Sequence, residues 1–300
     1  MSRTVTVGLD GSQESRAAAE WAAREARLRG LPLRLVHVWA PVAPAAEAPL
    51  LGAETHQHWT ERIPGETAEG LRLRHPAVEV VAEQRVGSPG EVLTAMADEA
   101  ELVVLGSRGL SGVGGFLMGS VGLTVVAHAQ HPVVLVRAGE QAADEHEQDP
   151  AGVPSAATPY RPVVLGVDIT APDDTVFAFA FEEAARRGTA VRAVHAWTTP
   201  PYHVYGLAVD PAFDQEVAQQ ETAALSETLR PWREKYPSVP VVEDCGAGNA
   251  SVRLVDAAHE ASLVVVGRRT RPARLGTHIG PVTHAVLHHA TAPVAVVPHE

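Results

Sequence analysis

A glycine-rich segment at residues 102–121 has the residue types needed to hold a phosphate group. An apolar run of mainly β-branched residues ends at Gly106, further glycines follow, and Ser120 begins an amphipathic segment. This order is typical of a strand, a loop and a helix. The first turn of a helix offers unpaired N–H groups to an anion, and glycine permits positive φ and close backbone approach. The pattern predicts an anion site, with a turn that only reverses the chain as the alternative.

The segment is not the phosphate loop of the common NTPases, because GxxxxGK[ST] occurs nowhere in the chain. Strands and helices alternate around it. In the first half we expect strands ending at Asp10 and Trp39, then strands at 78–86, 102–105 and 133–137, with helices at 15–29, 55–74, 91–99 and 120–129. Pro64 and Gly65 are expected to break or kink the second helix. This alternation predicts an α/β fold with a doubly wound, five-stranded parallel sheet.

The second half of the chain repeats the plan of the first. The stretch RPVVLGVDIT matches the first strand, and residues 87–137 align without a gap with 248–298, where roughly 19 of about 51 positions are identical. The segment between the halves is acidic, contains prolines and lacks apolar periodicity. We therefore predict a first domain over 1–138, a linker over 139–159 and a second domain over 160–300, each domain with its own sheet.

Two aspartates occupy equivalent positions after the first strand of each half, Asp10 and Asp168. In a doubly wound sheet the ligand binds outside the carboxyl ends of the strands, where the strand order reverses. We expect Asp10 and Gly106 to face each other across that crevice. A carboxylate there accepts hydrogen bonds from ribose hydroxyls or holds a hydrated cation. A turn or helix-cap role is the alternative, which the loss of the following Gly-Ser in the second half weakens.

Charge and composition exclude several classes of partner. The formal net charge of −12 argues against general affinity for nucleic acid or an anionic membrane, which both need a basic surface. The single cysteine, Cys245, excludes an internal disulfide and fits a reducing compartment. No leader pattern precedes the first strand and no apolar run approaches membrane-spanning length. We expect a cytoplasmic protein.

The chain resembles a tandem universal stress protein over nearly all residues except the linker. Its first half fits the ATP-binding signature of that family, G-x-x-G-x9-G-[ST], at Gly106, Gly109, Gly119 and Ser120. The resemblance implies Rossmann-like domains of the adenine-nucleotide alpha hydrolase type, with ATP and Mg²⁺ as ligands. It also implies that the signature residues hold ribose and phosphates, that Asp10 lies by the ribose or metal, and that the backbone of Val38 meets the adenine edge.

Family members are mostly ATP-binding regulators of stress, dormancy or growth arrest, and they commonly dimerise through the fifth strand. The resemblance therefore implies a regulatory protein partner whose identity the sequence does not give. Because two copies are fused, we expect the two fifth strands, VVLVR and VAVVP, to meet within one chain. A homodimer of the whole chain remains a further option.

The second copy departs from the signature. Gly267 and Gly280 remain, but Thr270 stands in place of Gly109 and Pro281 in place of Ser120. Threonine resists positive φ, and proline has neither an N–H nor a hydroxyl to donate. Loss of about two donors, at roughly 1.5–3 kcal/mol each, predicts binding weaker by about 10² to 10⁴. Four arginines are in a position to offset this loss or to bind another anion: Arg268, Arg269, Arg271 and Arg274.

Catalysis is not expected. No GxSxG elbow is present, the glycine loop has no lysine, and the sequence shows no second carboxylate beside Asp10. Phosphoryl transfer needs positioned cations, and Arg108 is the only one inside the first signature. Two hypotheses follow, a nucleotide-dependent regulator and an interaction scaffold with little nucleotide dependence. Slow, incidental ATP hydrolysis is a third reading.

Histidines and the cysteine give weaker signals. His284 and His288 stand one helical turn apart, a spacing found in metal sites, but no third ligand is evident, so no metal site is predicted. His37 and His195 lie within apolar strands and are expected to be hydrogen-bonded core residues. Cys245 is expected to be a small core residue, because nothing in its surroundings favours a thiolate.

Overall fold

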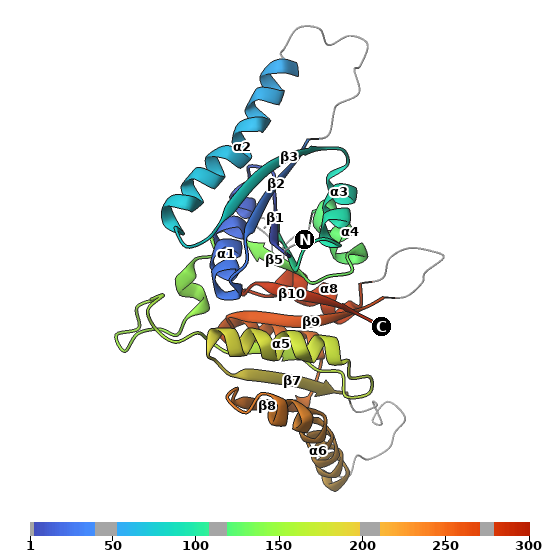
Figure 1. Cartoon of the computed structure of the whole chain (residues 1–300). Helices are drawn as coiled ribbons and strands as arrows, with labels where there is room; N and C mark the ends of the chain where they lie inside the picture. The colour runs from blue at the N-terminus through green and yellow to red at the C-terminus, as the bar shows by residue number, and fades with distance from the viewer. Residues whose placement is uncertain (1–2, 40–52, 108–118, 199–210, 271–278) are drawn as a thin grey trace. The chain divides into compact units, whose positions relative to one another are not determined.

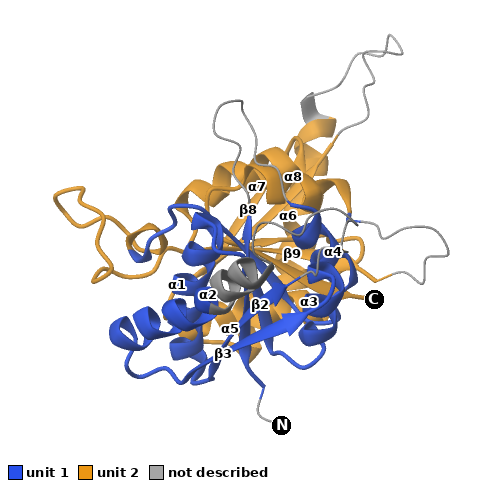
Figure 2. Cartoon of the chain, turned by 90° about the horizontal axis from the view of Figure 1, so that it is seen from above, with its two compact units in different colours: residues 1–142, 271–279 blue, residues 143–270, 280–300 orange. Residues whose placement is uncertain are grey.

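The computed structural model describes residues 3–39, 53–107, 119–198, 211–270 and 279–300. The chain divides into two compact units, the first running to Ala142 and the second beginning at Ala143 (Figure 2). Each unit alternates strands with helices, as Figure 1 shows. The α/β fold with parallel sheets predicted from the repeat is confirmed.

Unit 1 is built on a parallel sheet with the strand order β3-β2-β1-β4-β5 in the described residues. Its strands are β1 (Val5–Leu9), β2 (Leu33–Trp39), β3 (Val80–Val86), β4 (Leu102–Ser107) and β5 (Val133–Arg137). Its helices are α1 (Gln13–Arg29), α2 (Ala53–Arg74), α3 (Pro89–Ala97) and α4 (Ser120–His128). The chain winds outward in both directions from the neighbours β1 and β4, so the switch point lies between these two strands.

Unit 2 repeats this order, here written from the last strand as β10-β9-β6-β7-β8. Its strands are β6 (Val163–Gly166), β7 (Val191–Trp197), β8 (Val241–Ala247), β9 (Leu263–Arg269) and β10 (Val294–His299). Its helices are α5 (Asp174–Arg187), α6 (Pro211–Lys235), α7 (Ala250–Ala257), the short η3 (Ala258–Glu260) and α8 (Pro281–His289). The switch point of this unit lies between β6 and β9.

The first helix of each unit shows why these boundaries form. The hydroxyl of Ser12 accepts a hydrogen bond from the backbone N–H of Ser15 at 3.1 Å, which caps α1 two residues earlier than expected. Gly30 ends the helix in the left-handed region at φ 64°, a conformation that suits glycine. Asp173 and Gly188 cap α5 in the same way. Both helices bury an apolar stripe against their own sheet.

Helix α2 continues through Pro64, so the break that was one of the two expected effects does not occur. Pro64 is buried on the side of the helix that also buries Ala68 and Leu71. Proline removes one backbone donor and crowds the preceding turn, at a cost of about 3 kcal/mol in a helix interior. Packing of this face against β2 and β3 is sufficient to hold the helix.

The segment predicted as a linker, 139–159, is ordered and partly buried. A short helix, η1 (Ala142–Glu145), is followed by bridges that join His146 to Tyr160 and Gln148 to Pro154. The rings of His146 and Tyr160 have centroids 4.0 Å apart, and Arg161 donates to the His146 carbonyl at 2.8 Å. Most of this segment is thereby attached to unit 2.

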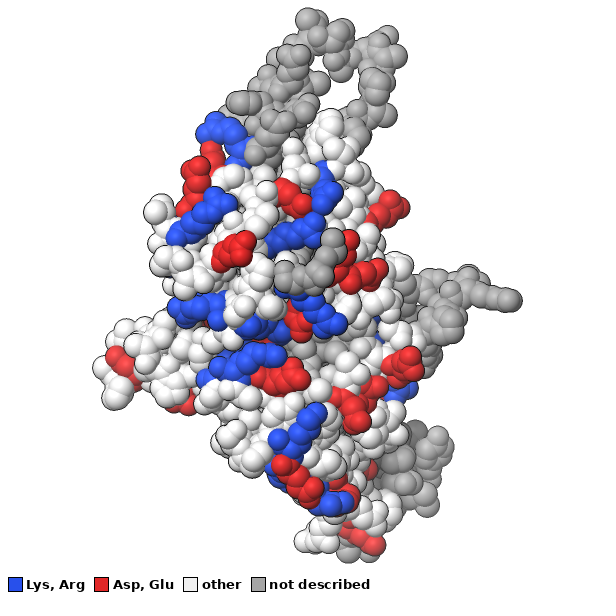
Figure 3. All heavy atoms as spheres, in the orientation of Figure 1, with Lys and Arg blue, Asp and Glu red and all other residues white. Residues whose placement is uncertain are grey.

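The outermost strands, β3 and β8, have ion pairs along their length. In β3, Glu83 pairs with Arg34 of β2 at 2.6 Å and with Arg85 at 3.0 Å. In β8, Asp244 pairs with Arg192 of β7 at 2.6 Å and with Arg253 of α7. On the face in Figure 3, acidic and basic side chains are interspersed. Within the described residues, no helix has the length and apolar character that a membrane span requires.

Candidate functional site

The sheet of unit 1 opens at the carboxyl ends of its two central strands. The pairing of β1 with β4 stops at Val7 and Val104, whereas its pairing with β2 continues to Leu9 and His37. A cavity of about 310 Å³ lies at this split. It is bordered by the end of β1, the start of α1, the start of α3, the end of β4 and the start of α4. This is the position that the strand order predicts for a ligand.

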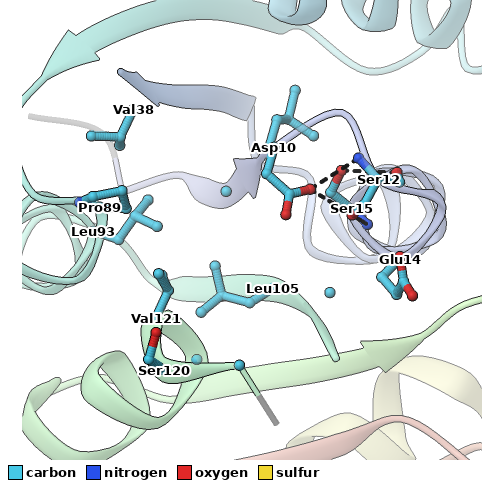
Figure 4. A pocket seen from close by; sticks show the side chains of 15 residues that line it. Asp10, Ser12, Glu14, Ser15, Val38, Pro89, Leu93, Leu105, Ser120 and Val121 are labelled. Atoms are coloured by element: carbon cyan, nitrogen blue, oxygen red, sulfur yellow. Dashed lines mark hydrogen bonds between the residues drawn. The ribbon is translucent and has the colours of Figure 1, made fainter. Parts of the chain in front are cut away.

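One side of the cavity carries polar groups from the β1–α1 turn, namely Asp10, Ser12, Glu14 and Ser15. Figure 4 shows the Asp10 carboxylate turned toward Ser12 and Ser15. The Asp10 Oδ1 atom accepts from the Ser12 N–H at 3.0 Å and from the Ser12 hydroxyl at 2.5 Å. Glu14, the second residue of α1, also borders the cavity, and its backbone and Cβ lie where a Cβ of Gly106 would stand.

The opposite side of the cavity is apolar. Val38 at the end of β2, Pro89 and Leu93 of α3, and Leu105 of β4 line it. Val38, Pro89 and Leu93 lie together in Figure 4, across the cavity from the Asp10 turn. A wall of this kind suits a flat, weakly polar group. Pro89 and Leu93 were not among the predicted site residues, since nothing in their spacing distinguishes them from core residues.

The start of α4 forms a third border, with Gly119, Ser120, Val121 and Gly122 lining the cavity. These residues span the N-cap and first turn, where backbone N–H groups lack helical partners and attract negative charge. In the described residues no hydrogen bond involves the Ser120 hydroxyl, which leaves it available to a ligand. The backbone of Gly119 has φ −63° and ψ 155°. Gly119 itself therefore does not use the positive φ that glycine permits.

Gly106 lines the same cavity and also permits close packing of α1 on β4. A Cβ atom at this position would lie 2.5 Å from the Glu14 carbonyl carbon and 2.7 Å from the Ser15 nitrogen. The strand continues through Gly106 to Ser107, two residues further than expected. Arg108 and Gly109 lie outside the described residues.

At the equivalent corner of unit 2, the aspartate has hydrogen-bond and ion-pair partners within the unit. Asp168 accepts hydrogen bonds from Thr170, at 3.0 Å from its N–H and 2.6 Å from its hydroxyl, and Arg269 lies 3.3 Å from its other oxygen. Partial burial raises the pKa of Asp168, but the Thr170 hydrogen bonds and the Arg269 charge together hold this pKa below its ordinary value. The carboxylate that corresponds to Asp10 thus has a cationic partner within its own unit.

The second signature is altered in a related way. β10 pairs with β9 as far as His299, and the N–H and hydroxyl of Thr270 both donate to the His299 carbonyl, at 2.6 and 2.9 Å. The His299 ring lies 2.7 Å from where a Cβ of Gly267 would stand. Gly280 has φ −59°, and Pro281 takes the first helical position of α8. Arg268 is buried, which lowers its pKa, while Arg271 and Arg274 lie outside the described residues.

The histidines and the cysteine that the sequence singled out are not among the residues that line the unit 1 cavity. His37 and His195 are buried and hydrogen-bonded to backbone carbonyls, as expected. The rings of His284 and His288 have centroids 4.4 Å apart, and burial together with the His288 charge lowers the pKa of His284. The searched part of the chain holds no group of three or more residues able to share a metal ion. Cys245 is half-buried, and this burial raises the pKa of its thiol.

An open parallel sheet with a ligand-sized cavity at its switch point defines the class of α/β proteins that bind small ligands beyond the strand ends. The chain belongs to the universal stress protein family, whose model matches residues 1–137 and again residues 159–298. The duplication inferred from the repeat is thereby confirmed.

Relatives span nearly the whole chain. A universal stress protein of Mycobacterium tuberculosis is 36% identical over 300 residues, covering 97% of this chain and 96% of the relative. Another, from Mycolicibacterium smegmatis, is 34% identical over 306 residues, with 98% and 96% covered. The crystal structure of a universal stress protein from Archaeoglobus fulgidus superimposes with a TM-score of 0.69 at 15% identity, covering 99% of this chain and 98% of that one. At this identity the likeness concerns the fold.

Proposed function

We propose that unit 1 binds an adenine nucleotide, ATP with Mg²⁺, and that binding alters the protein's affinity for a regulatory partner. The observation that carries the proposal is that an apolar wall, a polar turn and the first turn of α4 all border the same cavity. The apolar wall at Val38 suits adenine, Asp10 suits a ribose hydroxyl, and the α4 N-terminus with Ser120 suits the phosphates.

The same cavity favours the magnesium complex over the free anion. Asp10 and Glu14 are two acidic residues at the border of a site that would hold a polyphosphate. Oxygen ligands of this type suit Mg²⁺, which is commonly held by one or two carboxylates together with phosphate oxygens. Asp10 and Glu14, with the Ser12 hydroxyl, are the residues that would hold it. The ion would supply a positive charge that offsets the repulsion between the phosphate and carboxylate groups.

The proposed role is regulatory and not catalytic. The described border of the cavity includes two acidic residues but no lysine, arginine or histidine. Efficient phosphoryl transfer uses cations placed at the transferred group. Nucleotide-dependent change in the loops beside the cavity is therefore the proposed output, and the cytoplasm, which fits a single free thiol, is the proposed location.

For unit 2 we propose weak nucleotide binding or none. Asp168 already pairs with Arg269, Thr270 is tied to the His299 carbonyl, and Pro281 lacks the hydroxyl of Ser120. Unit 2 then acts as the structural partner of unit 1, and pairing of the two fifth strands within the chain remains the proposed arrangement. A whole-chain homodimer is a further possibility that sedimentation would decide.

Calorimetric titration of Mg-ATP into nucleotide-stripped protein tests the proposal, with Gly119→Ala and Gly280→Ala as a matched pair. Both glycines have φ near −60°, so alanine fits either backbone without strain. A Cβ at Gly280 would meet no atom within 4 Å, so Gly280→Ala reports the effect of the substitution where the protein leaves open space. We expect one site per chain, weakened about tenfold or more by Gly119→Ala, which corresponds to at least about 1.4 kcal/mol, and unchanged by Gly280→Ala.

Other outcomes discriminate among the alternatives. Two sites of similar affinity would mean that the arginines of unit 2 compensate for the hydrogen-bond donors that its signature lacks. No binding by the unaltered protein would reject the nucleotide proposal and favour the scaffold hypothesis. Binding that leaves partner affinity unchanged would reject the regulatory output and retain the site.

A further inference from the structure

The last carbonyl of β1, at Leu9, belongs to the peptide that leads directly into Asp10. On its β4 side, β1 has already separated, since that pairing ends at Val7. On its β2 side, the Nδ1 atom of His37 lies 2.8 Å from the Leu9 oxygen. Because a carbonyl only accepts, Nδ1 carries the hydrogen, which fixes the tautomer of the ring.

The contact recurs in unit 2, which makes it an independent second observation. The Nδ1 atom of His195 lies 3.1 Å from the oxygen of Val167, the residue that precedes Asp168. Each histidine is 7% exposed, so each hydrogen bond forms in a nearly dry environment. The same side chain therefore holds the same peptide, directly before the site aspartate, in both copies.

We infer that His37 is a positioning residue for Asp10, and that it fixes the direction in which the Asp10 carboxylate enters the nucleotide cavity. A peptide group is planar, so holding the Leu9 carbonyl also holds the Asp10 nitrogen and restricts rotation of the turn that follows. That turn carries the Asp10–Ser12 hydrogen bonds and the cap of α1. The inference rests on the proposed nucleotide site, which Asp10 serves.

His37 acts on the ligand only through the backbone. Successive side chains of a strand point to opposite faces of a sheet. Val38 lines the cavity, while His37 is not among the lining residues. A change at His37 therefore removes no ligand contact, and any loss of affinity must pass through the Leu9–Asp10 peptide. In unit 2, the Nε2 atom of His195 also lies 3.1 Å from the Oε2 atom of Glu221 in α6. The histidine that corresponds to His37 therefore has a second hydrogen-bond partner.

The test compares His37→Asn with His37→Gln. The asparagine amide places a donor close to the Nδ1 position, whereas the glutamine amide extends toward the Nε2 position. Two quantities are measured, the hydrogen exchange of the Ser12 and Ser15 amides in ligand-free protein and the dissociation constant for Mg-ATP. His195→Asn and His195→Gln form the matched control, and Asp10→Ala is combined with each His37 change.

We expect His37→Gln to speed exchange of the Ser12 and Ser15 amides and to raise the dissociation constant about tenfold, the scale of one lost buried hydrogen bond. His37→Asn should leave both quantities within about threefold of the unaltered protein. In the Asp10→Ala background His37→Gln should add less than about twofold, because coupled residues are not additive. His195→Gln should loosen the Asp168 turn and leave ATP affinity unchanged.

Equal losses for the asparagine and glutamine variants would show that His37 only fills space, and would overturn the inference. A further tenfold loss in the Asp10→Ala background would also overturn it, because His37 would then act independently of Asp10. If the unaltered protein takes no Mg-ATP, the proposed function fails. The exchange rates of Ser12 and Ser15 still decide whether His37 holds the turn.

Discussion

The two units share a scaffold and differ at the corner where a ligand would bind. Both have the same strand order, the same histidine-to-carbonyl contact and an aspartate at the end of the first strand. In unit 1 that corner is a cavity bordered by an apolar wall and a helix N-terminus. In unit 2 the corresponding aspartate pairs with Arg269, and His299 packs against Gly267. The two copies thus share the sheet and differ in a few residues at the strand ends.

The largest effect is expected from alanine at the strand glycines. At Gly106 the new methyl would meet backbone atoms of Glu14 and Ser15, which cannot move without displacing α1. We expect Gly106→Ala to lower the free energy of unfolding by about 3 kcal/mol or more, and Gly267→Ala by about 1 kcal/mol, because there the methyl meets the His299 side chain. Urea denaturation of the full chain measures both.

The double variant Gly267→Ala with His299→Ala is the control, since it removes the ring that the methyl would meet. This double variant should be at least as stable as His299→Ala alone. Similar losses at the two glycines, without such recovery, would show that the corners pack alike and that the contrast between them is wrong.

An intermediate effect is expected at the first helical position after each signature loop. Ser120→Ala removes a hydroxyl donor at the α4 N-terminus and should weaken Mg-ATP binding about ten- to a hundredfold, as for one hydrogen bond to a charged group. Pro281→Ser restores the missing hydroxyl in unit 2. It should create no second site in calorimetry, because Thr270 stays bonded to the His299 carbonyl. A second site in the Pro281→Ser protein would mean that the residue at this one position accounts for the difference in nucleotide binding between the two units.

The smallest effect concerns acid stability through Asp168. Its folded pKa lies below the ordinary value of 3.8, so its ionised form stabilises unit 2 above that pH. This stabilisation is lost as the pH falls through the folded pKa. Asp168→Asn and Arg269→Gln should each reduce stability at pH 7 by no more than the roughly 0–1 kcal/mol typical of exposed pairs, and should flatten the loss below pH 4. Thermal unfolding between pH 2 and 7 measures this, and an unchanged acid profile would contradict the pairing.

Much of the fold was predictable from the sequence. The alternating apolar runs indicate the order of strands and helices, and the internal repeat shows the same order a second time. The fifth strand was placed without error at Val133–Arg137, and the first helix differed by two residues because Ser12 caps it. The expected break at Pro64 does not occur, because packing of α2 against β2 and β3 outweighs the local cost of the proline. The order within 139–159 was missed because its contacts, such as His146 with Tyr160, lack any periodicity.

The candidate site was predictable in outline and less so in detail. Asp10, Val38, Gly106, Gly119 and Ser120 all border one cavity. Glu14 was missed because the sequence predicted the helix to begin at Ser15, one residue after it, whereas α1 begins at Gln13. The conformation of Gly119 was not readable from its identity, since glycine occurs both for positive φ and for the lack of a side chain.

The ion pairs along β3 and β8 have a consequence for the behaviour of the protein in concentrated solution. An outermost strand leaves backbone groups that another molecule's strand can join, which is a route to fibrous aggregates. Glu83, held by Arg34, and Asp244, held by Arg192, fix charges on the strands where such joining would begin. A second molecule's strand would have to displace or bury these charges in order to add to the sheet. At β3 and β8, these ion pairs therefore oppose the addition of a further strand.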